Sequence, residues 1–428
     1  MLKYATMLVL TAPFILAGAT AADIEKSKDW PQWRGPHRDG ISSETNLLRE
    51  WNIDGPTLLW NSNKVNGGKS VGTGFSSISI ADGKIFTMGD RGKDGFVFCL
   101  EEKTGKHLWQ TRVSQGQGDG PRCTPTVDGD RVYVLSRQGN LVCLETAKGG
   151  IIWQKDLKKD FKGRMMSSWD YSESPTIDGN KLICTPGGDD AALIALDKTN
   201  GEVIWKTPIK NAGGAGYASV VIAEVGGIRQ YITLLGAGQG LVGVDAKDGK
   251  FLWNYPKIAN GTANIPTAIV KGDLVFTSTG YGTGAALLQL IPDENGIKAK
   301  EVYFLPGNKL QNHHGGMVLL GDYIFGGHGH SNGMPFCLEM RTGKFAWPPT
   351  RGEGNGSAAV VYADGNLYFR YENNVMVLIE ASPAAYKIKG QFNLPGGLST
   401  GWPHPVVLHG RLYIRGQDQI LCYDISRK

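Results

Sequence analysis

The sequence predicts an all-β protein, an eight-bladed β-propeller in which four-stranded sheets form a closed ring. Two observations lead to this fold class. A strand–turn–strand pattern, clearest at residues 141–153, returns along the chain with a glycine four residues before a tryptophan. The chain also contains 60 glycines and no long amphipathic stretch, as turn-rich sheets require.

The spacing of the repeat gives the number of blades. Its clear copies end at Trp109, Trp153, Trp205, Trp253 and Trp347. The first four are separated by 44, 52 and 48 residues, and the 94 residues from Trp253 to Trp347 make two periods, with Tyr303 between them. Phe392 continues the series 45 residues later.

The last repeat is incomplete, which predicts how the ring closes. Another period after Phe392 would run beyond Lys428, so the final unit, at residues 405–424, has three strands. Residues 57–60 supply a strand that ends in a tryptophan, 49 residues before Trp109. We expect this N-terminal strand to complete the C-terminal blade, because a closed ring leaves no free sheet edge.

The repeat resembles that of the pyrroloquinoline-quinone (PQQ) propellers. Residues 97–109 and 335–347 carry its pattern: a small residue, an acid, Thr-Gly-Lys, and a strand that ends in tryptophan. Residues 29–35 and 58–60 resemble the N-terminal segment of the dehydrogenases in that superfamily, which also includes non-enzymatic outer-membrane assembly factors. The resemblance covers the whole mature chain and implies the fold. The activity must come from the site, because propellers host unrelated functions.

Three segments are expected: a signal peptide at 1–22, an N-terminal segment at 23–55 and the propeller at 56–428. Lys3, an apolar run from about residue 7 to 16 and small residues at 19–22 fit a cleaved export signal, too short to span a membrane. Ala19 stands where a lipoprotein signal has cysteine. We expect a periplasmic or secreted protein without a membrane span, in which residues 29–40 pack along the ring.

Charge and cysteine content narrow the partners. The 45 basic and 40 acidic residues are mixed throughout, so nucleic acid is not expected to bind. Cys99, Cys143 and Cys337 share a repeat position with Ala195 and Gly243, which indicates buried thiols rather than disulfides. We expect a monomer that binds a small molecule or carbohydrate, with a protein as a further candidate partner.

Residues that occur once, rather than in every blade, are the candidates for a site. They fall in loops that lead into the inner strands, and in loops between the second and third strands. Both sets surround the same mouth of the channel. In blade six, His313 and His314 lie in the first kind of loop and His328 and His330 in the second. These four of the chain's eight histidines are expected to meet there.

Neutral imidazoles bind transition metals or move protons, so the histidines of this rim have two candidate roles. His328 and His330, two residues apart in an extended chain, should point the same way. The candidate metal ligands are His313, His328 and His330. The candidate catalytic residues are two possible bases and two possible acids: His314, His404, Tyr171 and Tyr217.

A second set of residues is assigned to ligand binding. The resemblance implies PQQ with calcium, for which Trp169 would stack on the quinone and oxygens would come from Asp170, Glu173 and Asn264. The chain departs from the quinoprotein pattern in having neither adjacent cysteines nor a Cys-x-x-Cys-His haem motif.

Three functions therefore remain open. They are a quinoprotein-type oxidoreductase, an enzyme that processes a carbohydrate, and a non-catalytic scaffold for a protein or glycan. A carbohydrate would stack on Trp169 and Trp402, with Arg122 binding a carboxylate. The cofactor stays unknown, with PQQ and calcium, or a transition metal, as the candidates.

Overall fold

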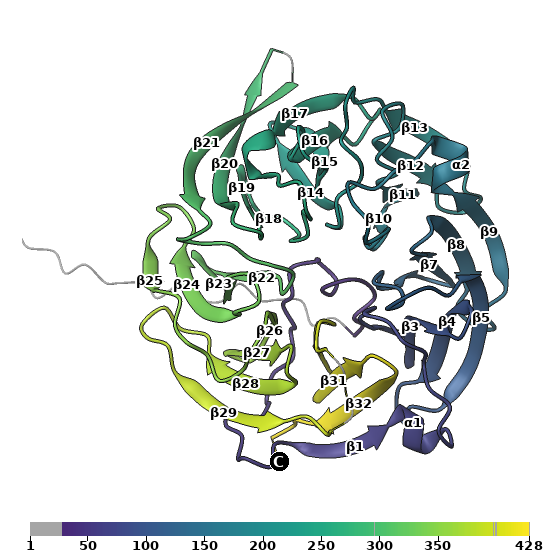
Figure 1. The fold of residues 1–428 in the computed structure, drawn as a ribbon, viewed down its shortest axis with the longest axis vertical. Helices are drawn as coiled ribbons and strands as arrows, with labels where there is room; N and C mark the ends of the chain where they lie inside the picture. Colours follow the sequence, from purple (N-terminus) through teal and green to yellow (C-terminus); the bar gives the residue numbers. More distant parts are fainter. Residues whose placement is uncertain (1–27, 295, 397, 399, 428) are drawn as a thin grey trace, which may run out of the picture.

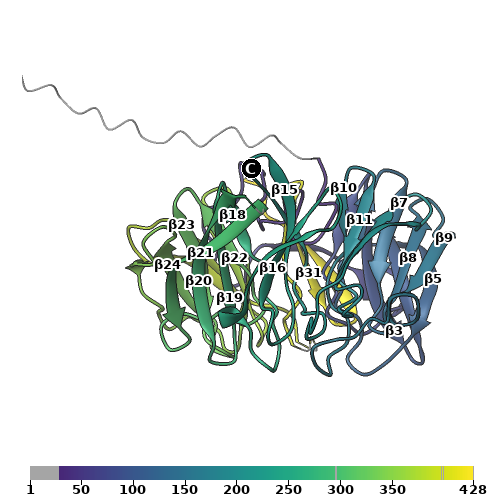
Figure 2. The ribbon, with the colours of Figure 1, turned by 90° about the horizontal axis from the view of Figure 1, so that it is seen from above.

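The computed structural model describes residues 28–294, 296–396, 398 and 400–427. It confirms the eight-bladed propeller, with eight four-stranded sheets arranged around a central axis (Figure 1). In side view the strands run between the two faces of a disc (Figure 2). The expected signal peptide at 1–22 lies outside the described residues. Within them, no helix has both the length and the apolar character that crossing a membrane requires.

Each blade is an antiparallel meander. Blade 1 consists of β2 Ser79–Ala81, β3 Lys84–Arg91, β4 Asp94–Glu101 and β5 His107–Gln115, and blade 2 of β6 Thr126–Asp128, β7 Arg131–Leu135, β8 Asn140–Glu145 and β9 Ile151–Asp156. Blade 3 consists of β10 Thr176–Asp178, β11 Lys181–Cys184, β12 Leu193–Asp197 and β13 Val203–Thr207, and blade 4 of β14 Val221–Val225, β15 Ile228–Leu234, β16 Leu241–Asp245 and β17 Phe251–Tyr255. Blade 5 consists of β18 Ile269–Lys271, β19 Leu274–Thr279, β20 Gly284–Asp293 and β21 Gly296–Pro306. Blade 6 consists of β22 Met317–Leu320, β23 Tyr323–His328, β24 Met334–Glu339 and β25 Phe345–Trp347, and blade 7 of β26 Ala358–Ala363, β27 Asn366–Tyr371, β28 Val375–Glu380 and β29 Ile388–Asn393. Blade 8 consists of β30 Val406–Leu408, β31 Arg411–Gly416, β32 Gln419–Asp424 and β1 Thr57–Asn61. The short helices are α1 Ser62–Val65, α2 Leu157–Phe161 and η1 Pro256–Ile258.

The strand register explains the small residue of the repeat. Cys143 stands opposite Trp153 in the neighbouring outer strand, and Gly243 stands opposite Trp253. A Cβ at Gly243 would overlap the Trp253 indole, so only a small side chain fits beneath the ring. All six cysteines are free and buried, as predicted, and burial raises the pKa of the Cys143 thiol to about 11.

The glycine and the tryptophan recur together because each tryptophan docks on the next blade. The Trp109 indole covers Gly149, where a Cβ would lie 2.5 Å from its Cε3 atom, and Trp109 Nε1 donates to the Thr146 carbonyl at 3.0 Å. Gly149 also has φ +73°, in the left-handed region that favours glycine. The repeat is therefore a blade-to-blade contact as well as a hairpin.

The ring closes as predicted. β1 pairs antiparallel with β32, with Trp60 opposite Cys422. Trp60 is buried and covers Gly105 of blade 1, where a Cβ would lie 2.6 Å from its ring. A strand from the start of the chain thus supplies both the missing edge and the missing docking tryptophan.

The N-terminal segment at residues 29–48, which we call the plug, crosses the centre of the ring (purple in Figure 1). The prediction that this region packs along the ring was wrong. The plug forms hydrogen bonds with seven blades, through Ile80, Val127, Ser174, Thr267, Met317, Tyr362 and Val407. Inner strands present unpaired backbone groups to the channel, and the plug satisfies several of them.

Candidate functional site

A cavity of about 200 Å³ lies on the predicted face. Its wall comes mainly from the loops that lead into the inner strands: Phe75, Arg122, Trp169, Tyr217, His313, His314 and Trp402. Tyr281, from the loop between β19 and β20, adds to this wall. Its floor is formed by Trp33 and Arg34 of the plug, beside His404. The plug therefore closes the channel mouth at its floor, and the pocket stays open on the opposite side.

Aromatic rings make up much of the wall. Trp402 packs on Phe75, with ring centroids 4.4 Å apart, and on His314 at 4.9 Å. Trp169 meets Tyr217 edge-on at 6.3 Å and is 41% exposed, which is high for a tryptophan. Such faces suit the apolar side of a ring-shaped ligand.

His313 is held on both sides. Its Nδ1 lies 2.7 Å from Ser357 Oγ and its Nε2 lies 3.1 Å from the Tyr281 hydroxyl. Burial, together with the neighbouring His314 and His330, lowers its pKa to about 2. His313 is therefore neutral at ordinary pH.

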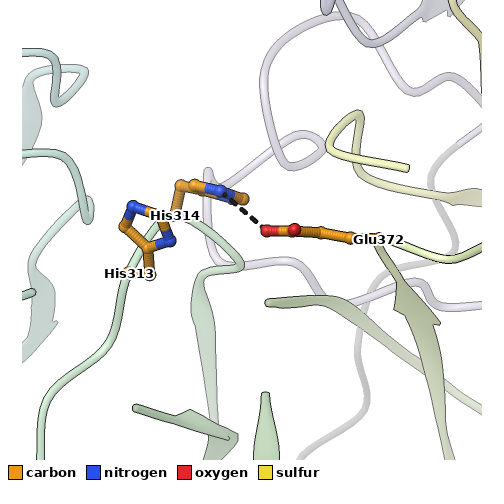
Figure 3. Close-up of side chains that lie close together, drawn as sticks. All are labelled: His313, His314 and Glu372. Carbon is orange, nitrogen blue, oxygen red and sulfur yellow. Dashed lines mark ion pairs between the residues drawn. The ribbon is translucent and has the colours of Figure 1, made fainter. Parts of the chain in front are cut away.

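His314 pairs with a carboxylate that the sequence did not single out. Its Nε2 lies 3.4 Å from Glu372 Oε1 (Figure 3). Burial on its own raises the pKa of Glu372, but the contact with His314 and hydrogen bonds from Ser357 lower it to about 2. Glu372 is thus anionic and faces the imidazole that lines the cavity.

The same cluster offers the geometry for a metal ion. Among the described residues, His313, His314 and Glu372 each have one ligand atom within 4.8 Å of the others. This set differs from the predicted His313, His328 and His330. His328 Nδ1 accepts the Gln311 N–H at 3.2 Å.

His330 has a different environment from His328. It is exposed and packs on Tyr281, with ring centroids 4.6 Å apart. Gly329 between the two histidines has φ +93°, so the chain is not extended there and the expected alternation is interrupted.

His404 connects blade 8 with blade 6 and with the plug. Its Nε2 lies 3.1 Å from the His314 carbonyl oxygen, and its ring packs on Trp33. A carbonyl only accepts hydrogen bonds, so Nε2 carries the proton and Nδ1 is the acceptor. Burial, and then the charge of Arg34, lower the pKa of His404 to about 3, so it too is neutral.

Tyr217 and Arg122 both line the cavity, Tyr217 as a protonated phenol and Arg122 as a cation that is paired with an acid. The Tyr217 hydroxyl lies 2.6 Å from Ser167 Oγ, and burial raises its pKa, which keeps it protonated. Arg122 Nη2 pairs with Asp119 Oδ2 at 2.8 Å, while Nη1 donates to the Trp169 carbonyl at 2.7 Å. The charge of Arg122 is therefore already compensated.

Glu173 and Asn264, which were predicted to bind a ligand, do not line the cavity, because the residues on either side of each take the lining positions. Ser172 and Ser174 line it, whereas Glu173 between them is buried and accepts the Thr185 N–H at 2.5 Å. Burial raises the pKa of Glu173 to about 7. Asn264, between two lining residues, donates to the Leu235 carbonyl at 2.8 Å.

Asp170 and Tyr171 are also engaged elsewhere. Asp170 pairs with Arg137 at 3.2 Å, and the Tyr171 hydroxyl donates to the Pro186 carbonyl at 2.8 Å. With Glu173 behind the wall as well, the predicted calcium ligands do not face the cavity. The described residues thus do not fit PQQ with calcium as the sequence suggested.

Several residues of the site were not predicted, among them Trp33, Arg34, Phe75, Tyr281 and Glu372. Trp33 and Arg34 belong to a segment with no counterpart in the repeat, and the rule that residues occurring once are site candidates would have selected them. Glu372 lies in a loop between second and third strands, as the rim histidines do. No sequence signal connects Glu372 with His314, because 58 residues separate them.

The fold and cavity define a PQQ-repeat propeller with a pocket of aromatic rings and histidines at one channel mouth. Residues 93–348, more than half of the chain, match the family described as "Outer membrane protein assembly factor BamB". The chain belongs to this family.

Individual relatives are distant. The chain is 24% identical over 353 residues to the BamB assembly factor of Burkholderia pseudomallei, covering 70% of this chain and 85% of that one. It is 23% identical over 436 residues to tetrathionate hydrolase of Acidithiobacillus ferrooxidans, covering 90% and 80%. The quinohemoprotein alcohol dehydrogenase of Comamonas testosteroni superposes with a TM-score of 0.63 at 14% identity, covering 95% and 82%, a likeness of fold alone.

Proposed function

We propose that this protein is an exported enzyme that binds a small ring-shaped ligand, foremost a carbohydrate unit, in the cavity and moves a proton with His314 as base. One observation carries the proposal. His314, which pairs with Glu372, lines a pocket walled by aromatic rings. The similarity to relatives named as outer-membrane assembly factors supports export.

The choice of His314 follows from the other histidines. A general base works best when its pKa lies near the working pH. The pKa values of His313 and His404, about 2 and about 3, make both poor bases. His314 has the anionic Glu372 beside it, whose charge would stabilise the imidazolium that proton transfer creates. The protonated Tyr217 is the matching candidate acid.

The ligand class follows from size and surface. A cavity of about 200 Å³ is smaller than the roughly 300–1,000 Å³ of sites for drug-sized ligands, so it suits one ring. Trp33, Trp169 and Trp402 offer the faces on which a sugar ring stacks. A relative that covers 90% of this chain is named a hydrolase, which supports catalysis. Quinoprotein chemistry has support from fold similarity but lacks calcium ligands in the cavity.

The test is product formation from a panel of oligosaccharides, followed by mass spectrometry. We expect His314→Gln and Glu372→Gln to lower turnover about 100-fold or more while binding persists. His409→Gln is the matched control, because His409 forms a similar pair with Glu102 at 2.8 Å that does not line the cavity. Turnover that survives in both cavity variants would refute the proposal. Loss of turnover in EDTA would assign the cluster to a metal instead.

Protein docking is a second candidate function. The outer strands of blades 8, 1, 2 and 3 expose aliphatic side chains: Leu58, Leu59, Leu108, Ile151, Ile152, Val203 and Ile204. Exposed apolar residues on edge strands favour association, and the family includes assembly factors. A photo-crosslinking residue at position 152 should capture a defined partner in the native host, whereas one at exposed position 53 should not.

A further inference from the structure

The plug places an unusual charge at the floor of the cavity. Arg34 is 4% exposed, and its Nη2 donates to the Asp39 carbonyl at 2.7 Å and to the Met317 carbonyl. Its Nε and Nη1 are buried with no partner among the described residues. Three of the five N–H donors of this guanidinium therefore have no acceptor.

No carboxylate of the described chain compensates this charge by an ion pair. The charge of Asp39 acts on Arg34 without an ion pair, and Asp39 Oδ1 instead accepts the Ile41 N–H at 3.0 Å. Burial lowers the pKa of Arg34 only to about 10, so the side chain stays charged at neutral pH. An unpaired buried charge is costly, and a fold keeps one where something else completes it.

The surroundings of Arg34 are shaped to receive it. Gly316 is next to the guanidinium: a Cβ there would collide with Nη1 and lie 2.7 Å from His404 Cε1. Trp33 and His404 stand beside it with ring centroids 4.4 Å apart. His404 is neutral and adds no second positive charge.

Arg34 differs in this respect from the other arginines of the centre. Arg122 lines the same cavity but is paired with Asp119. Arg38, in the plug and 6% exposed, donates to Gln32 Oε1 at 2.9 Å and to the Ser174 carbonyl at 3.2 Å, and it does not line the cavity. Among these three, Arg34 alone combines an uncompensated charge with a place in the cavity.

We infer that the ligand is an anion, and that its carboxylate or similar acidic group lies at the cavity floor over Arg34, beside the packed rings of Trp33 and His404. This inference rests on the proposed function, because it requires that the cavity binds a ligand. It adds that the ligand is negatively charged. In a site shielded from water, a buried guanidinium distinguishes an anion from its neutral analogue far more strongly than an exposed one does. An acidic sugar fits this requirement together with the aromatic walls.

The test compares two sugars that differ at one carbon. Binding of glucuronate and of glucose is measured by calorimetry on the full mature chain, with benzoate and sulfate as further anions. We expect glucuronate to bind about tenfold more tightly than glucose or better. Arg34→Gln should abolish this preference, and Arg38→Gln, equally buried in the same plug, should retain it.

The outcomes separate this inference from the proposed function. Equal binding of both sugars, or a preference that survives in Arg34→Gln, would overturn the anion assignment and leave the carbohydrate site standing. Arg34-dependent binding of benzoate or sulfate without either sugar would support the anion site and remove the carbohydrate. If none of the four probes binds, both fall. Should Arg34→Gln not fold, the comparison of the two sugars on the unaltered chain still decides.

Discussion

The indole of Trp33 and the imidazole of His404 lie with their centroids 4.4 Å apart, although 371 residues separate them in the chain. Through His404 Nε2 this contact continues to the His314 carbonyl at 3.1 Å. The plug, blade 8 and blade 6 thereby meet at one point beneath the cavity. The protonation state of His404 should therefore affect the stability of this junction.

We predict that His404 makes the fold sensitive to acid. Its folded pKa of about 3 lies below the ordinary histidine value of 6.5, so the unfolded chain binds more protons between these values. Stability is therefore present above pH 6.5 and is lost as the pH falls toward 3, by about 3 kcal/mol at pH 4. Urea unfolding at pH 7 and pH 4 should show a smaller difference in His404→Gln. His37→Gln, at an exposed histidine, serves as the control. An equal difference in the free energy of unfolding between pH 7 and pH 4 in both variants would contradict the prediction.

Glu173 should act in the opposite direction. Its folded pKa of about 7 lies above the ordinary glutamate value of 4.5, so the folded chain binds more protons between these values. Its contribution is present below pH 4.5 and is lost as the pH rises through 7, by roughly 2 to 3 kcal/mol between pH 5 and pH 8. Glu173→Gln should be more stable than the unaltered chain at pH 8, as unfolding curves would show. Glu145→Gln, at an exposed position, should not be more stable than the unaltered chain at pH 8. An equal gain in the free energy of unfolding in this variant would refute the role of burial.

Closure of the ring depends on Trp60. This side chain is buried against Gly105 and near Tyr413, at a centroid distance of 6.1 Å. Trp60→Ala should lower the free energy of unfolding by about 3 to 5 kcal/mol, because a large buried ring leaves a cavity at the seam. Ile53→Ala, on a side chain 71% exposed, should change it by less than about 0.5 kcal/mol. A similarly small effect of Trp60→Ala, measured in urea, would mean that the seam adds little stability.

The cysteines should behave as packing residues. Cys143→Ala should cost about 1 kcal/mol, since Ala195 occupies the same position opposite Trp205 in the next blade. Alkylation of the denatured, unreduced protein should modify all six thiols in the mass spectrum. Any disulfide-linked peptide would contradict this.

The propeller was predictable because its contacts are periodic. One aromatic residue per blade, in most blades docked on a glycine of the next, gives a period that spacing alone can count, and the unmatched Trp60 indicated where the ring closes. The direction of loop side chains was less predictable. Glu173 and Asn264 have the right chemistry and sit in the right loops, but in each the adjacent residues take the inward positions. Glu372 could not be linked to His314, because their contact arises only from the placement of blades 6 and 7.

The plug has a further consequence for what can reach His314. Because Trp33 and Arg34 close the pocket from behind, the ring is not a conduit, and a ligand leaves by the opening through which it came. A polymer therefore cannot thread through the centre of the ring past the site. If the ligand belongs to a polymer, the units next to the bound one must extend toward that opening.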